Sequence, residues 1–297
     1  MTPFTERIVQ FGTGAGRIGV VTEPVGTARI GILLILGAGI LHRVGPSRAA
    51  VQVARHLAAQ GIQSLRFDHA GIGDSDRGTE QLRESVMQDV RDGVDILLRD
   101  VPSASGHVTV LGFCAGADTA LVCAGLDPRI HSIALFDALV PRTVGHFFRA
   151  FGHRWSRATV RGMVTRVLRS LRRSPAAIRV APPDYFGLVA ANRREFCDIV
   201  RTLNDRRVRR LWLMTSGVLE YCSDPRQISE VLGNVASERL DQVEWNPAAD
   251  HVLSTRGQVD WLCHTLAYWM SDADRTPHSL ATARGSGARS AARGPRC

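Results

Sequence analysis

The segment 112–116, Gly-Phe-Cys-Ala-Gly, carries the strongest chemical signal in the sequence. It follows a β-type apolar run and precedes a helical run of small residues. In a strand-to-helix turn of the G-x-S-x-G type, the flanking positions must be small because the nucleophile is held in a strained, exposed conformation. Cys114 takes the serine position, where the N-terminus of the following helix favours a thiolate. We expect Cys114 to be a nucleophile and the Ala115 N–H to be an oxyanion donor. The alternative is a turn around a buried structural cysteine.

A cysteine nucleophile needs a general base, and His251 is the best candidate. It ends the segment Pro-Ala-Ala-Asp-His, after the last expected strand and before the last expected helix. An imidazole at this place can take the thiol proton and later return it to a leaving group or to water. His42, His69 and His131 are weaker alternatives.

Three carboxylates are candidates for orienting the histidine. We prefer Glu220, which lies a few residues past the expected strand 211–215. Asp224 comes second because an aspartate followed by proline is typical of a helix N-cap. Asp137, at the end of another expected strand, comes third.

A second oxyanion donor is expected in the turn after the strand 30–36, where the chain reads Gly-Ala-Gly-Ile at 37–40. Two glycines let the backbone approach a tetrahedral oxyanion closely, and we choose the Ala38 amide. The same glycines could line a nucleotide phosphate, but the G-x-G-x-x-G spacing with a downstream acid is not met.

The elements that must position these residues alternate between β-type and helical patterns, which is typical of βαβ units and a mostly parallel sheet. We expect strands at 8–11, 18–22, 30–36, 64–68, 108–113, 132–136, 211–215 and 242–245, the first two forming a hairpin. We expect helices at 46–60, 80–98, 115–125, 224–232 and 255–270.

The alternation stops between the strand 132–136 and the penultimate strand. Residues 140–204 show helical periodicity but no convincing strand, which predicts an inserted helical lid. Residues 274–297 are rich in Arg, Ser, Ala and Gly, so we expect a disordered tail after a single domain spanning 1–273.

The composition excludes several classes of mechanism. All 37 basic residues are arginine, so a Schiff-base, P-loop or Ser-Lys mechanism has no lysine to use. The six cysteines lack zinc-site spacing, and we expect reduced thiols, no metal and no cofactor. No apolar run is long enough to span a bilayer and no secretory signal is evident, so a cytoplasmic location is expected.

The formal net charge of +9 is concentrated locally. Ten arginines and no acidic residue lie between 138 and 183. This pattern predicts an anionic partner at the lid, such as an acidic acyl-carrier protein, rather than nucleic acid. An amphipathic helix with a solvated arginine face is an equal alternative.

With these residues in place, the chain resembles the α/β-hydrolase superfamily from about residue 7 to residue 270. The order nucleophile, acid, histidine is similar to that of the superfamily. The segment 42–46, His-Arg-Val-Gly-Pro, and the R-x-D-x-x-G-x-G-x-S stretch 66–75 resemble its serine aminopeptidase-like branch. A cysteine at position 114 departs from most members but is similar to dienelactone hydrolases and polyhydroxyalkanoate synthases.

The resemblance implies an α/β-hydrolase fold and an enzyme that acts on an ester or thioester through an acyl-cysteine intermediate. Hydrolysis is the first expectation. Transfer of an acyl group from a carrier-protein or CoA thioester to an acceptor is the second, since thioesters react readily with amines, thiols and alcohols. A catalytically inert binding module is the third.

Overall fold

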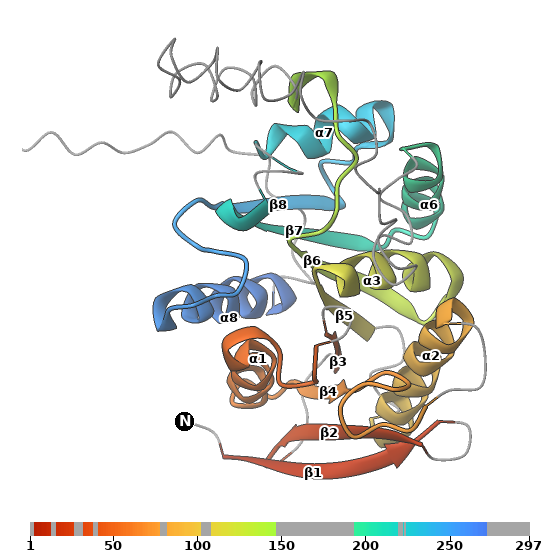
Figure 1. The fold of residues 1–297 in the computed structure, drawn as a ribbon, viewed down its shortest axis with the longest axis vertical. Helices are drawn as coiled ribbons and strands as arrows, with labels where there is room; N and C mark the ends of the chain where they lie inside the picture. Colours follow the sequence, from red (N-terminus) through yellow and green to blue (C-terminus); the bar gives the residue numbers. More distant parts are fainter. Residues whose placement is uncertain are drawn as a thin grey trace, which may run out of the picture.

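An eight-stranded sheet forms the centre of the molecule (Figure 1). The computed structural model describes residues 3–12, 16–26, 32–37, 41–77, 82–101, 108–146, 193–218, 222 and 224–271. The strands are β1 (Phe4–Phe11), β2 (Arg17–Pro24), β3 (Ile32–Leu36), β4 (Gln63–Phe67), β5 (Val108–Phe113), β6 (Ile130–Phe136), β7 (Arg209–Thr215) and β8 (Asp241–Asn246). The α-helices are α1 (Ala49–Ala58), α2 (Leu82–Asp100), α3 (Ala115–Leu126), α6 (Arg193–Asp205), α7 (Arg226–Leu232) and α8 (Arg256–Ser271).

The sheet is mostly parallel. Its strand order is β1-β2-β4-β3-β5-β6-β7-β8. β1 and β2 form an antiparallel hairpin, and β2 is antiparallel to β4, whereas every later pair is parallel. The carboxyl ends of β3 and β5 to β8 therefore meet at one edge of the sheet, where α/β proteins place their sites.

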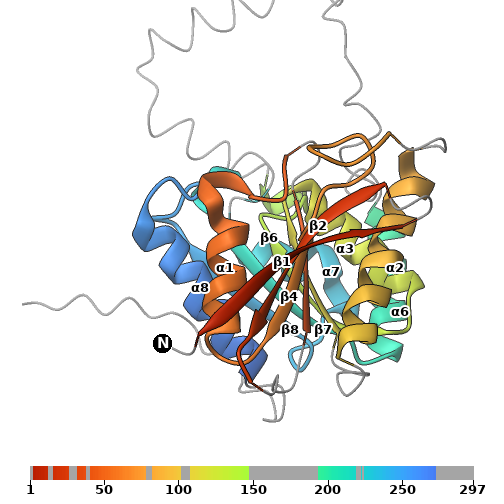
Figure 2. The same cartoon turned by 90° about the horizontal axis from the view of Figure 1, so that it is seen from below.

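Helices cover both faces of the sheet (Figures 1 and 2). α1 and α8 lie together on one face, while α2, α3 and α6 lie on the other. A hydrophobic core lies on each face of the sheet, and alternate residues of β3 point into one or the other. Leu33 and Ile35 pack with α1 and α8, and Leu34 and Leu36 pack on the opposite face. Burial on both faces explains why the central strands are continuous apolar runs in the sequence.

Each strand and helix expected outside 140–204 is present within a few residues of its expected bounds. The expected helix 46–60 differs at its start. A 3-10 turn, Pro46–Arg48, precedes α1, and Ser47 and Arg48 have positive φ values of 47° and 60°. The α-helix therefore begins at Ala49 rather than at the proline.

The predicted lid 140–204 lies mostly outside the described residues, as does the predicted tail 274–297. The described C-terminal end of the predicted lid is helix α6, which contacts α3 and α7. Its apolar side chains Phe196, Val200 and Leu203 are buried in the core. Residues 193–204 are therefore part of the layer that covers the sheet.

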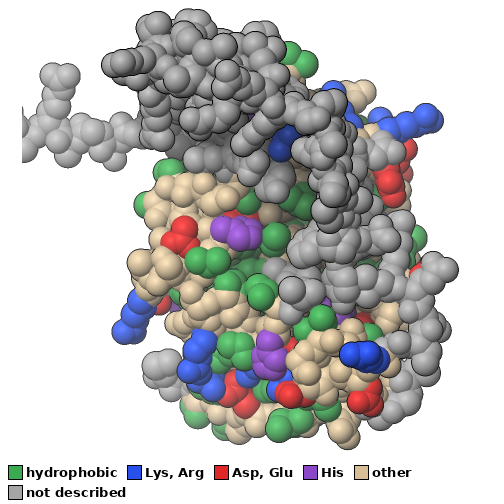
Figure 3. Space-filling view, in the orientation of Figure 1, with side chains coloured by type: hydrophobic (Ala, Val, Ile, Leu, Met, Phe, Trp, Pro, Cys, Tyr) green, Lys and Arg blue, Asp and Glu red, His purple; other side chains and the backbone are tan. Residues whose placement is uncertain are grey.

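The described surface mixes charges of both signs. Figure 3 shows basic and acidic side chains interspersed with hydrophobic ones on the face seen in Figure 1. Arg129, for example, pairs with Asp127 and Asp95. No helix among the described residues is long and apolar enough to cross a membrane.

Candidate active site

Cys114 lies in the turn between β5 and α3, in a backbone conformation that few residues adopt. Its φ is 51° and its ψ is −115°. A non-glycine residue in this region of backbone space stores strain that the surrounding structure must offset. The Cys114 N–H donates to the Phe136 carbonyl of β6 at 2.8 Å, and the Ala117 N–H donates to the Cys114 carbonyl at 2.9 Å. These bonds hold the turn at the carboxyl edge of the sheet.

The turn leaves no room for a side chain at either of the two flanking glycines. A Cβ atom on Gly112 would lie 2.1 Å from the carbonyl oxygen of Gly116. One on Gly116 would lie 2.4 Å from the carbonyl oxygen of Gly37. The turn that follows β3 therefore contacts the start of α3 directly.

This contact bears on the expected oxyanion donors. Ala115 is the first residue of α3, and N–H groups in the first turn of a helix have no acceptor within that helix. Ala38 lies outside the described residues, but the preceding Gly37 is held against Gly116.

His251 lies in the turn between β8 and α8, and its partner is Asp137. The imidazole Nδ1 lies 2.9 Å from Asp137 Oδ2. Asp137 directly follows β6, has a φ of 49°, and is fully buried. The His251 side chain keeps 37% of its surface exposed. A buried carboxylate thus holds an imidazole that remains accessible from solvent.

The same contacts favour the protonated imidazole. The hydrogen bond with Asp137, followed by one with Cys114, raises the pKa of His251 to about 10, against the opposing effect of burial. His251 therefore lies within hydrogen-bonding reach of both Cys114 and Asp137. An imidazolium beside the sulfur stabilises a thiolate.

The other carboxylates considered in the sequence lie elsewhere. Glu220, the preferred acid, lies outside the described residues. Asp224 accepts hydrogen bonds from the backbone N–H of Arg226 at 2.8 Å and from its guanidinium, at the start of α7. The expected capping role is not met as predicted, because α7 begins at Arg226 and its N-cap is Pro225, without a side-chain capping bond. Asp137, the third choice, is the carboxylate that the described structure places on His251.

The alternative histidines have different partners. His42 lies beside Asp68 and the Arg43 guanidinium. His69 is buried against Asp89, and the imidazole of His131 contacts a backbone carbonyl. The described contacts bring none of them to Cys114.

Thr215, at the end of β7, was not singled out in the sequence. Its backbone N–H donates to Asp137 Oδ1 at 2.7 Å, and its hydroxyl donates to Asp137 Oδ2 at 2.6 Å. The next residue, Ser216, bonds through its N–H and hydroxyl to the Ala249 carbonyl in the loop that carries His251. A threonine at a strand end has no distinguishing sequence pattern, so only the fold identifies this contact.

Cys114 differs in exposure from the other described cysteines. It is partly exposed, whereas Cys123, Cys197, Cys222 and Cys263 are buried. Burial raises the pKa of Cys123 and of Cys263 to about 12. Reagents that require an accessible thiolate should therefore discriminate between Cys114 and these thiols.

The stretch 66–75 spans the last two residues of β4 and the loop that follows it. The Asp68 carboxylate accepts bonds from Arg43, and the Ser75 hydroxyl donates to the Asp68 carbonyl at 2.7 Å. His42, Asp68 and Asp74 come close enough together to hold a cation. The Arg43 guanidinium already bonds to both carboxylates, so a positive charge is present there.

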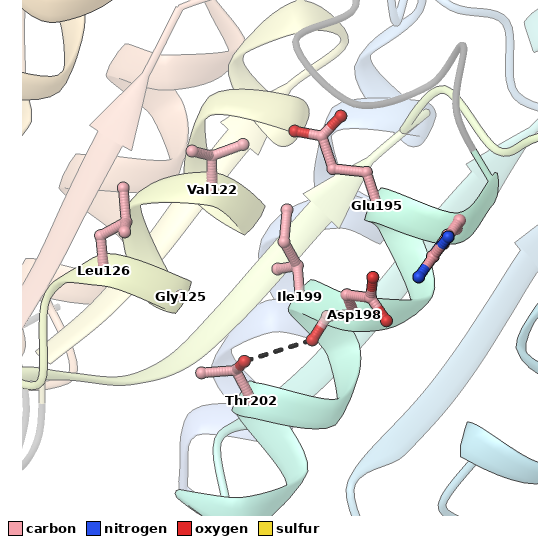
Figure 4. Close-up of a pocket in the computed structure, with 8 residues that line it drawn as sticks. Val122, Gly125, Leu126, Glu195, Asp198, Ile199 and Thr202 are labelled. Carbon is pink, nitrogen blue, oxygen red and sulfur yellow. Dashed lines mark hydrogen bonds between the residues drawn. The ribbon is translucent and has the colours of Figure 1, made fainter.

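A groove between α3 and α6 lies away from this site (Figure 4). It has a volume of about 530 Å³. Its α3 residues are Val122, Gly125 and Leu126, near the end of the helix opposite Cys114. At about 1.5 Å per residue, eight to twelve residues of helix place the groove roughly 12–18 Å from the nucleophile.

The fold is similar to that of several solved hydrolases. No protein-family model and no curated protein matches the sequence. An esterase from Pyrococcus furiosus matches with a TM-score of 0.59 at 14% identity, covering 90% of this chain and 91% of the esterase. A thioesterase domain from the curacin biosynthetic pathway matches with a TM-score of 0.53 at 16% identity, covering 91% of this chain and 99% of that domain. The esterase domain of a Rhodothermus marinus protein matches with a TM-score of 0.53 at 18% identity, covering 90% and 97%. The chain therefore has the α/β-hydrolase fold.

Proposed function

We propose that this protein is a hydrolase that cleaves an ester or thioester through Cys114, His251 and Asp137. The observation that carries the proposal is the 2.9 Å contact between His251 and the buried Asp137, in a site where His251 also reaches Cys114. A nucleophile, a base and a group that orients the base are the three parts that covalent acyl chemistry needs. The stretch 66–75 supports membership of the serine aminopeptidase-like branch.

The reaction would proceed in two steps. The Cys114 sulfur attacks the carbonyl carbon, and the negative charge on the carbonyl oxygen is stabilised by the Ala115 N–H and by a donor from the turn after β3, for which we keep Ala38. His251 gives its proton to the departing alcohol or thiol, leaving an acyl-cysteine. His251 then takes a proton from water, and the resulting hydroxide adds to the thioester. Collapse of this second tetrahedral intermediate releases the acid and expels the Cys114 thiolate beside the protonated His251, which restores the starting pair.

Acyl transfer is the second candidate, and the cysteine favours it. A cysteine thioester is attacked more readily by amines and thiols than by water, so an acceptor can replace water in the second step. The arginines between 138 and 183 would suit a carrier protein or a CoA phosphate, since guanidinium groups pair with planar anions. The curacin thioesterase domain has the same fold.

The test is to incubate the protein with an acyl-pantetheine thioester and to follow its intact mass. Hydrolysis predicts turnover with a transient adduct on Cys114 and none on Cys114→Ala. An adduct that persists until an amine, thiol or alcohol acceptor is added would contradict hydrolysis and support transfer.

Iodoacetamide labelling separates both candidates from an inert binding module. Cys114 should react much faster than the buried Cys123, and His251→Ala should slow Cys114 without changing Cys123. Equal slow labelling of both cysteines, with no adduct, would contradict the proposal.

A further inference from the structure

Thr215 ends strand β7 and also contacts the carboxylate of Asp137. Its N–H and its hydroxyl bind the two oxygens of Asp137 from the neighbouring strand, at 2.7 Å and 2.6 Å. The oxygen that accepts the hydroxyl, Oδ2, is also the one in contact with His251. We propose that Thr215 is a positioning residue that fixes the Asp137 carboxylate for His251, an inference that rests on the proposed function.

The surrounding loop fixes the direction of the hydroxyl proton. The Gly217 N–H donates to Thr215 Oγ1 at 3.1 Å. Since this bond occupies a lone pair of the hydroxyl oxygen, the single hydroxyl proton is directed to Asp137. Thr215 therefore acts on the carboxylate as a donor only.

Burial makes this donor important. Asp137 and Thr215 both have 0% exposure, so water does not solvate the carboxylate. Among the described residues, the side-chain bonds of Asp137 go to Thr215 and His251, and no arginine pairs with it. The orientation of the carboxylate therefore depends on Thr215.

The backbone of Asp137 is held by a bond of its own, whereas the direction of its carboxylate depends on the contact with Thr215. Its N–H donates to the Leu213 carbonyl at 2.8 Å, and its φ of 49° turns the chain away from β6. The carboxylate consequently points along the sheet edge toward β7 and β8. Without the hydroxyl, it keeps one fixed oxygen and gains freedom to rotate away from His251.

Two substitutions separate the hydroxyl from the shape of the side chain. Thr215→Val keeps the branched shape and removes the hydroxyl, whereas Thr215→Ser keeps the hydroxyl and removes the methyl group. Loss of a hydrogen bond to a charged group, if felt fully in the transition state, slows a reaction by about 10- to 100-fold. We expect Thr215→Val to lower kcat by about that factor with little change in KM, and Thr215→Ser to stay within a few-fold of the unaltered protein.

A double-mutant cycle identifies the route of the effect. In an Asp137→Asn background, Thr215→Val should cause little further loss, because both changes disable the same contact. Melting temperatures of all variants are measured in parallel. A loss of activity that only reflects a less stable fold would appear in Thr215→Ser as well as in Thr215→Val, together with a lower melting temperature in both. Iodoacetamide labelling of Cys114 gives a second readout that needs no substrate, and it should slow in Thr215→Val.

The outcomes distinguish this inference from the function on which it rests. Fast labelling of Cys114 and turnover in the unaltered protein, with Thr215→Val unaffected and Thr215→Ser impaired, would show that Thr215 only fills space and would overturn the inference alone. An additive loss in the double-mutant cycle would also overturn it. Slow labelling of Cys114 and no turnover in the unaltered protein would overturn both.

Discussion

Asp137 reaches His251 from β6, the strand next to the one that carries Cys114. The described contacts thus join Asp137 at the end of β6, Thr215 at the end of β7 and the loop after β8 that carries His251. Each contributes a group that its neighbours orient. A buried carboxylate paired with a half-exposed imidazole favours a proton on the imidazole, which is the state required to protonate a leaving group.

The assignment of the acid is testable by a matched set of amide substitutions. Asp137→Asn keeps the size of the side chain, and asparagine tolerates the positive φ at this position. We expect activity to fall by about 10³-fold or more, by analogy with triad enzymes. Asp224→Asn should retain activity, because its carboxylate bonds to Arg226 at the start of α7. Full activity in Asp137→Asn with loss in Asp224→Asn or Glu220→Gln, measured as kcat/KM, would contradict the assignment.

The sequence alone ranks these carboxylates in a different order, for a physical reason. Each of the three follows an expected strand, so position along the chain hardly separates them. What distinguishes Asp137 is its backbone φ of 49° and its bonds to Thr215, which lies 78 residues later in the chain. Neither has a local sequence signature. Cys114 is easier to place because its flanking glycines lie within two residues of it.

At the scale of elements, local patterns predict most of the fold. Apolar runs and helical periodicity extend over whole strands and helices, so their order and approximate bounds follow from the sequence. The start of α1 is an exception, because Ser47 and Arg48 adopt positive φ values that their residue types do not favour. The Ser47 hydroxyl bonds to the Val252 carbonyl beside His251 at 2.8 Å, a long-range contact that the sequence does not reveal.

The loop after β7 must approach the histidine loop closely, which gives a prediction about Gly217. A Cβ atom there would lie 2.4 Å from the Cβ of His251 and 2.5 Å from its backbone nitrogen. Gly217→Ala should displace His251 and lower kcat/KM by about 100-fold, since displacements of about 1 Å cost that much in active sites.

The control for this change is Gly257→Ala in α8. A Cβ at Gly257 meets nothing within 4 Å, so this helical position should gain up to about 1 kcal/mol of stability with unchanged activity. Kinetics and thermal melts are measured on both variants. Equal activity of Gly217→Ala and the unaltered protein would show that the two loops are not rigidly coupled.

At the scale of the whole molecule, the sheet and its two helical layers bury the carboxyl of Asp118, and the described part of the chain does not supply hydrogen bonds to both of its oxygens. Asp118, on α3 one turn after Cys114, is 2% exposed, and its Oδ2 has no hydrogen-bond partner among the residues that the structure describes. Burial raises its pKa to about 7, opposed only in part by the backbone N–H of Leu139. Such a group links the stability of the entire fold to pH, because unfolding returns it to water.

The sign of this effect follows from the two protonation states. The unfolded carboxyl has a pKa of about 3.9, so the folded protein binds the proton more tightly. Stability is therefore lost as pH rises from about 4 to about 7, and the ionised carboxylate costs on the order of 4 kcal/mol above that range. Asp118→Asn removes the charge while keeping the shape. We expect it to melt close to the unaltered protein at pH 4 and clearly above it at pH 8.

Asp260→Asn supplies the matched control for this linkage. Asp260 lies on α8 with 52% of its side chain exposed, so its carboxylate is hydrated both in the folded chain and in the unfolded one. Its ion pair with Arg256 is exposed, so its substitution should shift the melting temperature little. The difference in melting temperature between Asp118→Asn and the unaltered protein should instead grow between pH 4 and pH 7 and then level off. A difference that stays constant across this range would mean that Asp118 is solvated in the folded protein, since only a dry carboxyl binds its proton more tightly after folding.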